Sequence, residues 1–279
     1  MAEVLVAEKA GACYGVERAL KMVREAAHDH PGEVRTLGPL IHNPLVVTQL
    51  EREGVSVSAR PEDAGGRVLL LRTHGVTPGE EARAREACAL VLDATCPFVK
   101  RAHNGAELLV REGYQVIIVG ETGHPEVEGT LGHAPDATVV ANAAELEALE
   151  VGRRVGLVVQ TTMTRAVLEE VVCALLGRCE ELRVIDTICE ATRERQEAAA
   201  RLAASSDVMV VIGGKNSANT THLAEICRAS CPATHHVESP DEIDAAWLEG
   251  AARIGITAGA STPQDQIDEI RSRIAELLC

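Results

Sequence analysis

A strand, a cysteine and a helix follow one another at three places in the chain, and this repeat limits the possible fold more than any other feature. Residues 90–96 (LVLDATC) and 183–189 (RVIDTIC) each place an aliphatic stretch and an Asp before a Cys, and residues 4–13 (VLVAEKAGAC) form a looser third copy. Each Cys is followed by a stretch with helical signals. The repeat predicts three related modules with a Cys at the same position in each.

The spacing after each cysteine is also repeated. A second strand ends in Gly 25, 24 and 24 residues after the Cys, and a polar residue follows that Gly. A third short strand comes next, and then a fourth strand that ends in another polar turn. The cysteines are Cys13, Cys96 and Cys189, the first polar positions are His42, His124 and Ser217, and the second are His74, Thr161 and Ser261.

Strands that alternate with helices predict right-handed βαβ connections and parallel sheets. We expect an α/β protein of three modules with about four strands each, over residues 1–96, 97–188 and 189–279. Ligands of parallel sheets gather at the carboxyl ends of the strands, where all three copies carry Cys, His, Thr or Ser. Three modules around a pseudo-threefold axis would bring these strand ends together at one point.

The composition argues against several classes of function. The 279 residues have a formal net charge of −15, and only four of them are aromatic: Tyr14, Phe98, Tyr114 and Trp247. Such a chain is poorly suited to nucleic-acid or anionic-membrane binding, and it lacks aromatic rings for stacking on bases. No apolar run approaches the roughly 20 residues that cross a bilayer, and the N-terminus lacks the pattern of a signal peptide. We expect a soluble, cytoplasmic protein.

Nine cysteines are many for a cytoplasmic chain, and an odd number without a secretion signal favours a metal site or thiol chemistry over disulfides. The usual role of a cysteine outside such a site is that of a small buried hydrophobe. We expect that role for Cys88, Cys173, Cys179, Cys227, Cys231 and Cys279. The three cysteines of the repeat suit an iron–sulfur cluster or zinc. A four-iron cluster held by three Cys would leave one iron open to substrate and able to deliver electrons.

The polar residues at the strand ends predict a pocket for phosphate or diphosphate. The segments KNSANT and TAGAS follow strand ends and are expected to open helices, whose free N–H groups favour anions. Histidine, serine and asparagine side chains add hydrogen bonds, and protonated histidine adds positive charge. The pocket residues are His42, His74, His124, Ser217, Asn219 and Ser261, whereas His28, His30, His133, His235 and His236 are expected on the surface.

The segment GHPEVEG places two carboxylates just after His124. Glu126 is a candidate general acid because it lies close to this histidine in the sequence. Glu128 is expected to be a solvated residue.

Six motifs and the N-terminal segment CYGVERA (13–19) together resemble the 4-hydroxy-3-methylbut-2-enyl diphosphate reductase family of the non-mevalonate isoprenoid pathway. The motifs are THGV (73–76), DATCP (93–97), GHPEVEG (123–129), QTT (160–162), GGKNSANT (213–220) and TAGAS (257–261). They occur in the expected order from the first strand to about residue 275. GHPEVEG and DATCP together are highly specific for this family.

The resemblance implies a trefoil of three αβ domains around one [4Fe–4S] cluster held by Cys13, Cys96 and Cys189. It implies that the diphosphate is bound by the pocket residues named above, with His124 nearby. It also implies that Glu126, Thr161 and His124 are the catalytic residues, that Thr161 orients the substrate hydroxyl and that Glu126 supplies protons to it. The products would be isopentenyl and dimethylallyl diphosphate, and reduced ferredoxin or flavodoxin would be the electron donor. No bound nucleotide or flavin is expected.

The chain departs from the family pattern at two places. Ala218 stands where the family often has a second serine, which puts one diphosphate hydrogen bond in question. Glu190, Arg193 and Glu194 add charge after the third cysteine ligand, where other members commonly have less charged residues.

Two alternative functions compete with the reductase. A quinolinate-synthase-like iron–sulfur dehydratase would also place three Cys around a cluster, but it would need arginines for a dicarboxylate, and the strand ends offer only Arg72. A non-catalytic iron–sulfur or zinc sensor should carry an effector domain or a basic DNA-reading helix, and neither is evident in the sequence.

Overall fold

The structure is a computed structural model that describes residues 2–278. It contains the repeat predicted from the sequence, and each copy runs strand, cysteine, helix and then three further strands with their helices. The first copy contains β1 (Glu3–Val6), α1 (Tyr14–Asp29), β2 (Val34–Leu37), α2 (Pro44–Arg52), β3 (Ser56–Ser58), β4 (Val68–Leu71) and α3 (Pro78–Ala87).

The other two copies have the same order of elements. The second contains β5 (Leu90–Asp93), α4 (Pro97–Arg111), β6 (Gln115–Val119), α5 (Pro125–His133), β7 (Thr138–Val140), β8 (Arg154–Val159) and α6 (Arg165–Leu175). The third contains β9 (Glu181–Ile185), α7 (Glu190–Ala203), β10 (Val208–Ile212), α8 (Ala218–Ser230), β11 (Thr234–Val237), β12 (Arg253–Ala258) and α9 (Gln264–Leu277). Short 3₁₀ helices cover Pro61–Ala64, Ala143–Leu146, Pro240–Glu242 and Ala245–Leu248.

Within residues 2–278, the strands form three four-stranded sheets, and neighbouring strands pair in parallel. The strand orders are β3-β2-β4-β5, β7-β6-β8-β9 and β11-β10-β12-β1. These orders are equivalent, because each sheet consists of three strands of one copy and the first strand of the next. The expectation of an α/β fold with three small parallel sheets is confirmed.

Contacts divide the chain into two compact units. Unit 1 comprises the described residues up to Val16, the segment His42–Leu45 and the residues from Glu190 onward, and unit 2 comprises Glu17–Ile41 and Val46–Cys189. The sheet with β1 lies in unit 1, and the other two sheets lie in unit 2. The division of the chain at residues 96 and 188 stays a prediction, and β1 lies in the sheet formed mainly by the third segment.

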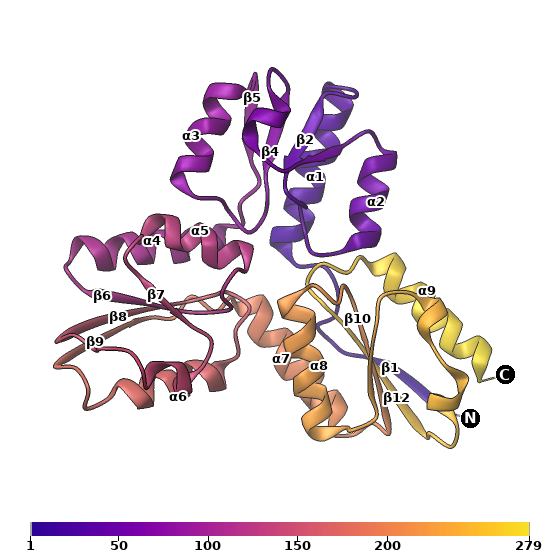
Figure 1. Ribbon diagram of the computed structural model, residues 1–279. Helices are drawn as coiled ribbons and strands as arrows, with labels where there is room; N and C mark the ends of the chain where they lie inside the picture. The colour runs from indigo at the N-terminus through magenta and orange to yellow at the C-terminus, as the bar shows by residue number, and fades with distance from the viewer. Residues whose placement is uncertain (1, 279) are drawn as a thin grey trace. The chain divides into compact units, whose positions relative to one another are not determined.

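In unit 1, helices cover both faces of the sheet (Figure 1). Ile267, Ile270 and Ile274 of α9 pack against one face, where they join the inward residues of β10 and β12. Residues of α7 and α8 pack against Met209 and Val211 on the other face. Strands buried on both sides need continuous aliphatic sequence, which explains why VMVVI and RIGITA lack the alternation of a half-exposed strand.

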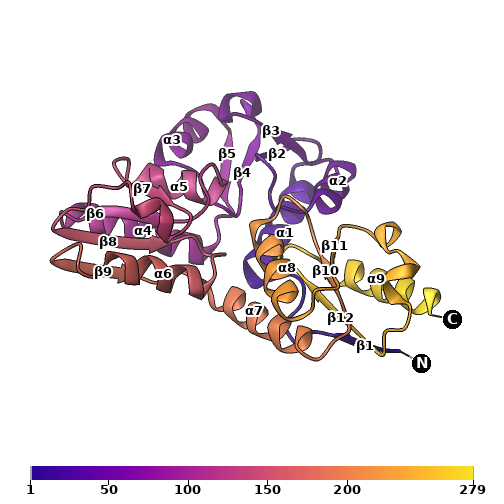
Figure 2. The same cartoon turned by 60° about the horizontal axis from the view of Figure 1, so that its bottom comes forward.

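In unit 2, the sheet with β6 and β8 is covered in the same way (Figure 2). Leu168, Val171 and Leu175 of α6 form a cluster on one face, and residues of α4 and α5 form a second cluster on the other. Pro97 and Pro125 occupy the first turns of α4 and α5, where a missing N–H does no harm. These two helices start four and six residues after the ends of β5 and β6.

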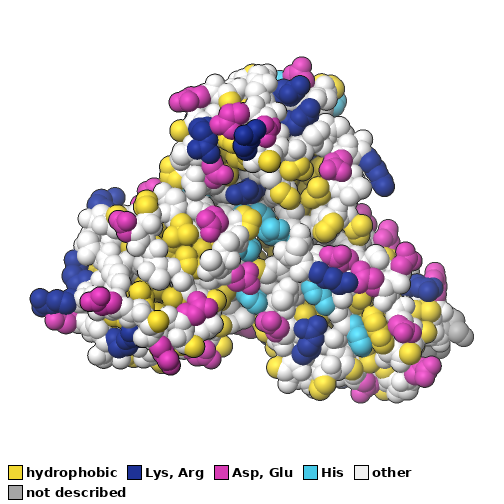
Figure 3. Space-filling view, viewed as in Figure 1, with side chains coloured by type: hydrophobic (Ala, Val, Ile, Leu, Met, Phe, Trp, Pro, Cys, Tyr) yellow, Lys and Arg dark blue, Asp and Glu magenta, His cyan; other side chains and the backbone are white. Residues whose placement is uncertain are grey.

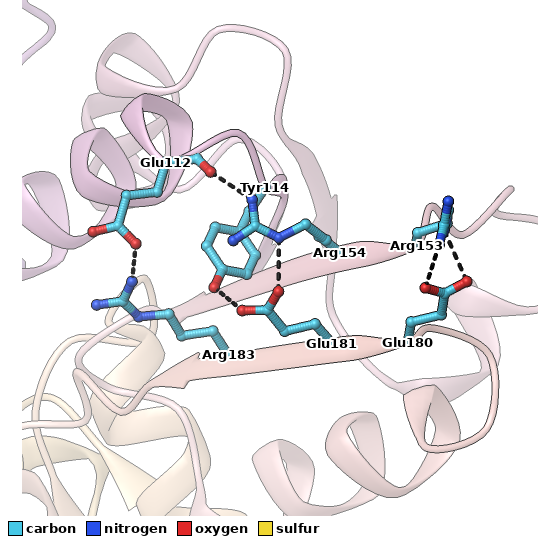
Figure 4. A network of polar contacts seen from close by, with 7 residues as sticks. All are labelled: Glu112, Tyr114, Arg153, Arg154, Glu180, Glu181 and Arg183. Atoms are coloured by element: carbon cyan, nitrogen blue, oxygen red, sulfur yellow. Dashed lines mark hydrogen bonds and ion pairs between the residues drawn. The ribbon is translucent and has the colours of Figure 1, made fainter.

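The amino ends of β8 and β9 carry a network of charged residues (Figure 4). Arg154 Nε donates to Glu181 Oε2 at 2.7 Å, and Arg153 pairs with Glu180 through two hydrogen bonds of 2.8 and 2.7 Å. Tyr114 also donates to Glu181. These pairs are exposed and each adds little stability. The network lies at the end of the sheet opposite the strand ends that carry the candidate site residues.

Acidic and basic side chains are interspersed on the face drawn in Figure 3. Among residues 2–278, no helix is long and apolar enough to span a bilayer.

Candidate active site

Each of the three candidate ligand cysteines lies between a strand and the start of a helix. Cys13 directly precedes α1, Cys96 is the N-cap of α4, and Cys189 directly precedes α7. All three are half-buried. The N–H groups at a helix start stabilise negative charge, so these positions suit a thiolate that binds a metal.

The backbone N–H of each cysteine donates a hydrogen bond to a polar turn at the end of a neighbouring strand. The N–H of Cys13 donates to Ala260 O at 3.1 Å, that of Cys96 to Thr73 O at 2.9 Å, and that of Cys189 to Thr161 O at 3.1 Å. These turns carry the second polar positions of the repeat, Ser261, His74 and Thr161. The same local geometry therefore recurs in all three copies.

The candidate residues fall into two sets that are described separately. Unit 1 contains Cys13, His42, Ser217, Asn219 and Ser261. Unit 2 contains His74, Cys96, His124, Glu126, Thr161 and Cys189. Within either unit, the described residues contain no group of three or more His, Cys, Asp and Glu side chains placed to hold a metal ion.

Glu126 and Thr161 form a buried pair in unit 2. Glu126 lies in the first turn of α5 and is only 2% exposed. Its carboxylate accepts from the Thr161 N–H at 2.6 Å and from Thr161 Oγ1 at 2.8 Å. Burial raises the pKa of Glu126 to about 7, although the two hydrogen bonds from Thr161 act in the opposite direction. The group can therefore both hold and release a proton near neutral pH.

His124 is the N-cap of α5, and its capping hydrogen bond fixes the orientation of its ring. Its Nδ1 accepts from the Glu126 N–H at 3.1 Å, so the ring proton of the neutral histidine lies on Nε2. The His74 ring packs edge-on against it, with ring centroids 5.7 Å apart. Glu128 is exposed, in agreement with the expectation that it is solvated.

In unit 1, Ser261 is held against the segment that carries His42. Ser261 Oγ donates to His42 O at 3.0 Å, and Asn43 Nδ2 donates to Ser261 O at 2.9 Å. A Cβ added at Gly214 would lie 2.9 Å from His42 O, so the loop before α8 also approaches this segment closely.

The start of α8 has the features of an anion site. Ser217 is its N-cap and accepts from the Thr220 N–H. Asn219 lies in the first turn and is 6% exposed, and its Nδ2 has no hydrogen-bond partner within residues 2–278. A buried amide without a partner is costly, so a ligand that accepts from Nδ2 would be stabilised here.

Comparison with known proteins identifies the family. The sequence family described as LytB protein matches residues 4–275. The chain belongs to the LytB family. The resemblance inferred from the motifs is thereby confirmed.

Curated relatives of this LytB-family chain include the 4-hydroxy-3-methylbut-2-enyl diphosphate reductases of Geobacter sulfurreducens and Aquifex aeolicus. The Geobacter sulfurreducens protein is 46% identical over 98% of this chain, and the Aquifex aeolicus protein is 44% identical over 99% of it. The match covers 97% of each relative. A solved structure of (E)-4-hydroxy-3-methyl-but-2-enyl diphosphate reductase, the terminal enzyme of the non-mevalonate pathway, is 43% identical with a TM-score of 0.72. It covers 99% of this chain and 100% of that one. The E-1-hydroxy-2-methyl-but-2-enyl-4-diphosphate reductase of Plasmodium falciparum is 26% identical with a TM-score of 0.92, over 96% and 86% of the two chains.

One buried histidine of this LytB-family chain, His103, was not predicted from the sequence and lies behind the His74 turn. A Cβ at Gly75 would lie 2.5 Å from His103 Cε1, and the His103 ring stacks on His133 with centroids 4.3 Å apart. Burial and the neighbouring His133 lower the pKa of His103 to about 4. A signal was available, because His103 lies one residue after Ala102 on the face of α4 that packs inward.

Asn43 and Gln266 were also missed. Both are buried and polar, and Asn43 Nδ2 donates a hydrogen bond to Gln266 Oε1. Asn43 directly follows His42 and could have been suspected for that reason, whereas the sequence around Gln266 gives no such signal.

Several other expectations need correction. Cys173 is exposed, because it lies on the outer side of α6 rather than in a core. Cys227 and Cys231 are buried as expected, Cys88 and Cys179 are half-buried, and Cys279 lies outside the described residues. Of the histidines expected on the surface, His28 is exposed and the other four are half-buried: His30, His133, His235 and His236. Among these, His133 contacts Glu107, His235 stacks on Trp247, and His236 donates to Gly213 O.

Proposed function

We propose that the chain removes the 4-hydroxyl group of 4-hydroxy-3-methylbut-2-enyl diphosphate by reduction and gives isopentenyl and dimethylallyl diphosphate. Membership of the LytB family and the reductases among its relatives support this reaction over the dehydratase and sensor alternatives. The structural observation that carries the proposal is the buried Glu126–Thr161 pair, which places an acid of raised pKa at a strand end.

The reaction needs two electrons and two protons. The bond between the carbon and the hydroxyl oxygen breaks, the oxygen leaves as water after it takes one proton, and the second proton forms a new C–H bond. Glu126 in its protonated form donates to Thr161 Oγ1, and the Thr161 hydroxyl in turn donates to the leaving oxygen. The pair thus orients the hydroxyl group and supplies its proton.

A [4Fe–4S] cluster held by Cys13, Cys96 and Cys189 is the proposed cofactor. The donor set fits, because the three half-buried thiols occupy equivalent positions at helix starts. When bound, such a cluster supplies electrons one at a time and a Lewis-acidic iron. Cys13, Cys96 and Cys189 would hold the cluster with no fourth equivalent cysteine, which would suit a catalytic site better than a structural one.

The proposed diphosphate ligands are His42, His74, His124, Ser217, Asn219 and Ser261. Ser217 accepts from Thr220 N–H and so keeps its own proton for a phosphate oxygen, and Asn219 Nδ2 is a ready donor. Ser261 must turn its hydroxyl away from His42 O before it can donate to the ligand. Ala218, the first residue of α8, offers no hydroxyl, so Ser217 is the single serine donor of this loop.

Reduced ferredoxin or flavodoxin in the cytoplasm is the proposed electron donor. Both are one-electron carriers, which matches the one-electron chemistry that a [4Fe–4S] cluster would supply.

The test is to purify the protein without air and assay it with a reduced low-potential donor. We expect a brown protein with about four iron and four sulfide ions per chain that forms both C5 diphosphates. Replacing Cys96 with Ser should remove the iron and the activity, whereas Cys88→Ser should change neither. A colourless zinc protein, or loss of iron in the Cys88 variant, would refute the proposal.

A further inference from the structure

Gln266 is a buried amide whose two polar atoms are both engaged. It lies in the first turn of α9, two residues after the start of the helix, and is 6% exposed. Its Oε1 accepts from Asn43 Nδ2 at 3.0 Å, and its Nε2 donates to Glu238 O at 2.6 Å. The side chain therefore joins two loops that are about 200 residues apart in the sequence.

On one side of Gln266, Asn43 extends the contact to His42 and Ser261. Asn43 is 2% exposed, and its Nδ2 donates to Ser261 O as well as to Gln266. Its Oδ1 accepts from the Leu45 N–H at 3.1 Å. Ser261 Oγ in turn donates a hydrogen bond to His42 O. The orientation of the Asn43 amide is thus fixed, and it holds two proposed diphosphate ligands together.

On the other side, Glu238 extends the contact to the loop before α8. Its Oε1 accepts from the Lys215 N–H at 2.6 Å, and its own N–H donates to Glu242 Oε1 at 3.1 Å. Lys215 Nζ pairs with Glu242 at 2.5 Å. This loop leads directly into Ser217 and Asn219, the other two proposed ligands in unit 1.

We infer that Gln266 is a positioning residue for diphosphate binding: its amide sets the spacing between the His42–Ser261 pair and the loop that carries Ser217. The inference rests on the proposed function, in which these residues bind the diphosphate. It assigns no contact with substrate to Gln266. The expected effect of its loss is therefore weaker binding of the diphosphate with little change in the chemical step.

The variant that tests this is Gln266→Met, which keeps the length of the side chain and removes both hydrogen bonds. We expect the KM for the allylic diphosphate and the Kd for inorganic diphosphate to rise about tenfold, with kcat within about twofold of the wild type and the iron content unchanged. Gln264→Met is the matched control, because Gln264 is exposed in the same helix turn and its side chain donates to Asp268 of the same helix. It should behave like the wild type.

If Gln266→Met does not fold, Gln266→Glu provides the second test. It keeps the acceptor for Asn43 and loses the donor to Glu238 O, and Gln264→Glu controls for the added charge. We then expect the Kd for inorganic diphosphate to rise severalfold more in Gln266→Glu than in Gln264→Glu. Equal Kd values, or a fall in kcat and stability without a change in KM, would overturn the inference. A wild-type protein that neither binds diphosphate nor turns over the substrate would overturn the proposed function as well.

Discussion

Glu126 shows how position alone separates two carboxylates of the same motif. Glu126 and Glu128 are two residues apart on α5, yet one is buried against Thr161 and the other is exposed to solvent. Burial opposes ionisation of the first and leaves it protonated in part at neutral pH. Glu126 can therefore serve as a proton donor whose protonated fraction changes with pH near neutrality.

Replacing Glu126 with Gln should lower kcat by at least about 100-fold, because the amide cannot release a proton to Thr161. The cluster and the substrate affinity should be retained. Steady-state kinetics together with iron analysis measure both effects. Glu128→Gln is the control and should keep full activity. A Glu126→Gln protein that lacks iron would show that the residue is structural.

The same residue should make stability depend on pH. The folded-state pKa of Glu126 is raised from 4.5 to about 7, so its contribution is fully favourable below pH 4.5 and is lost as the pH rises through 7. Glu126→Gln, which cannot ionise, should exceed the wild type in free energy of unfolding by up to about 3 kcal/mol at pH 8, with little difference at pH 4.5. Urea unfolding at the two pH values tests this, and a difference that does not vary with pH would contradict it.

Sequence alone identified Glu126 by its closeness to His124, but it could not supply the partner. Thr161 is 35 residues away, and its contact with Glu126 depends on the pairing of β6 with β8. His103 and Gln266 were missed for a related reason. Each is a polar residue on an inward helix face, and its partners come from distant loops that local pattern does not reveal.

At the level of elements, the aliphatic strands and their terminal cysteines were predictable because each strand is short, buried and followed by a helix signal. The strand that pairs with β1 could not be predicted in this way. Its sequence fits the repeat, but it pairs with β12 rather than with the strands that follow it. Sheet partners are set by packing between distant segments, which periodicity does not encode.

Deleting residues 2–7 should destabilise unit 1 because β12 would lose the partner of residues 253–256. We expect the unfolding midpoint of the transition that includes unit 1 to fall by at least about 5 °C, as measured by calorimetry. Glu3→Gln is the control, since it removes only an exposed ion pair with Arg253 and should change the midpoint very little. A truncated protein with an unchanged midpoint would mean that β1 contributes no stability.

For the whole molecule, the threefold repeat explains why one sequence pattern could predict so much. Every copy carries a cysteine and two polar turns at the ends of its strands. The hydrogen bond from the cysteine N–H to a polar turn occurs once in each of the three copies. What the copies do not share is the chemistry at the polar positions. Histidine, threonine and serine at equivalent places allow one repeated scaffold to offer both proton donors and anion ligands.

The pairing of β1 with β12 also has a consequence for biosynthesis. Glu3 is opposite Arg253, so β1 has no partner strand until residues about 250 positions later in the chain have been translated. The sheets with β2–β5 and β6–β9 contain only strands that are close in the chain, and they can assemble while translation continues. The strand β1 therefore stays unpaired until β12 has been made, so the sheet of unit 1 can be completed only after the strands of both other sheets are available.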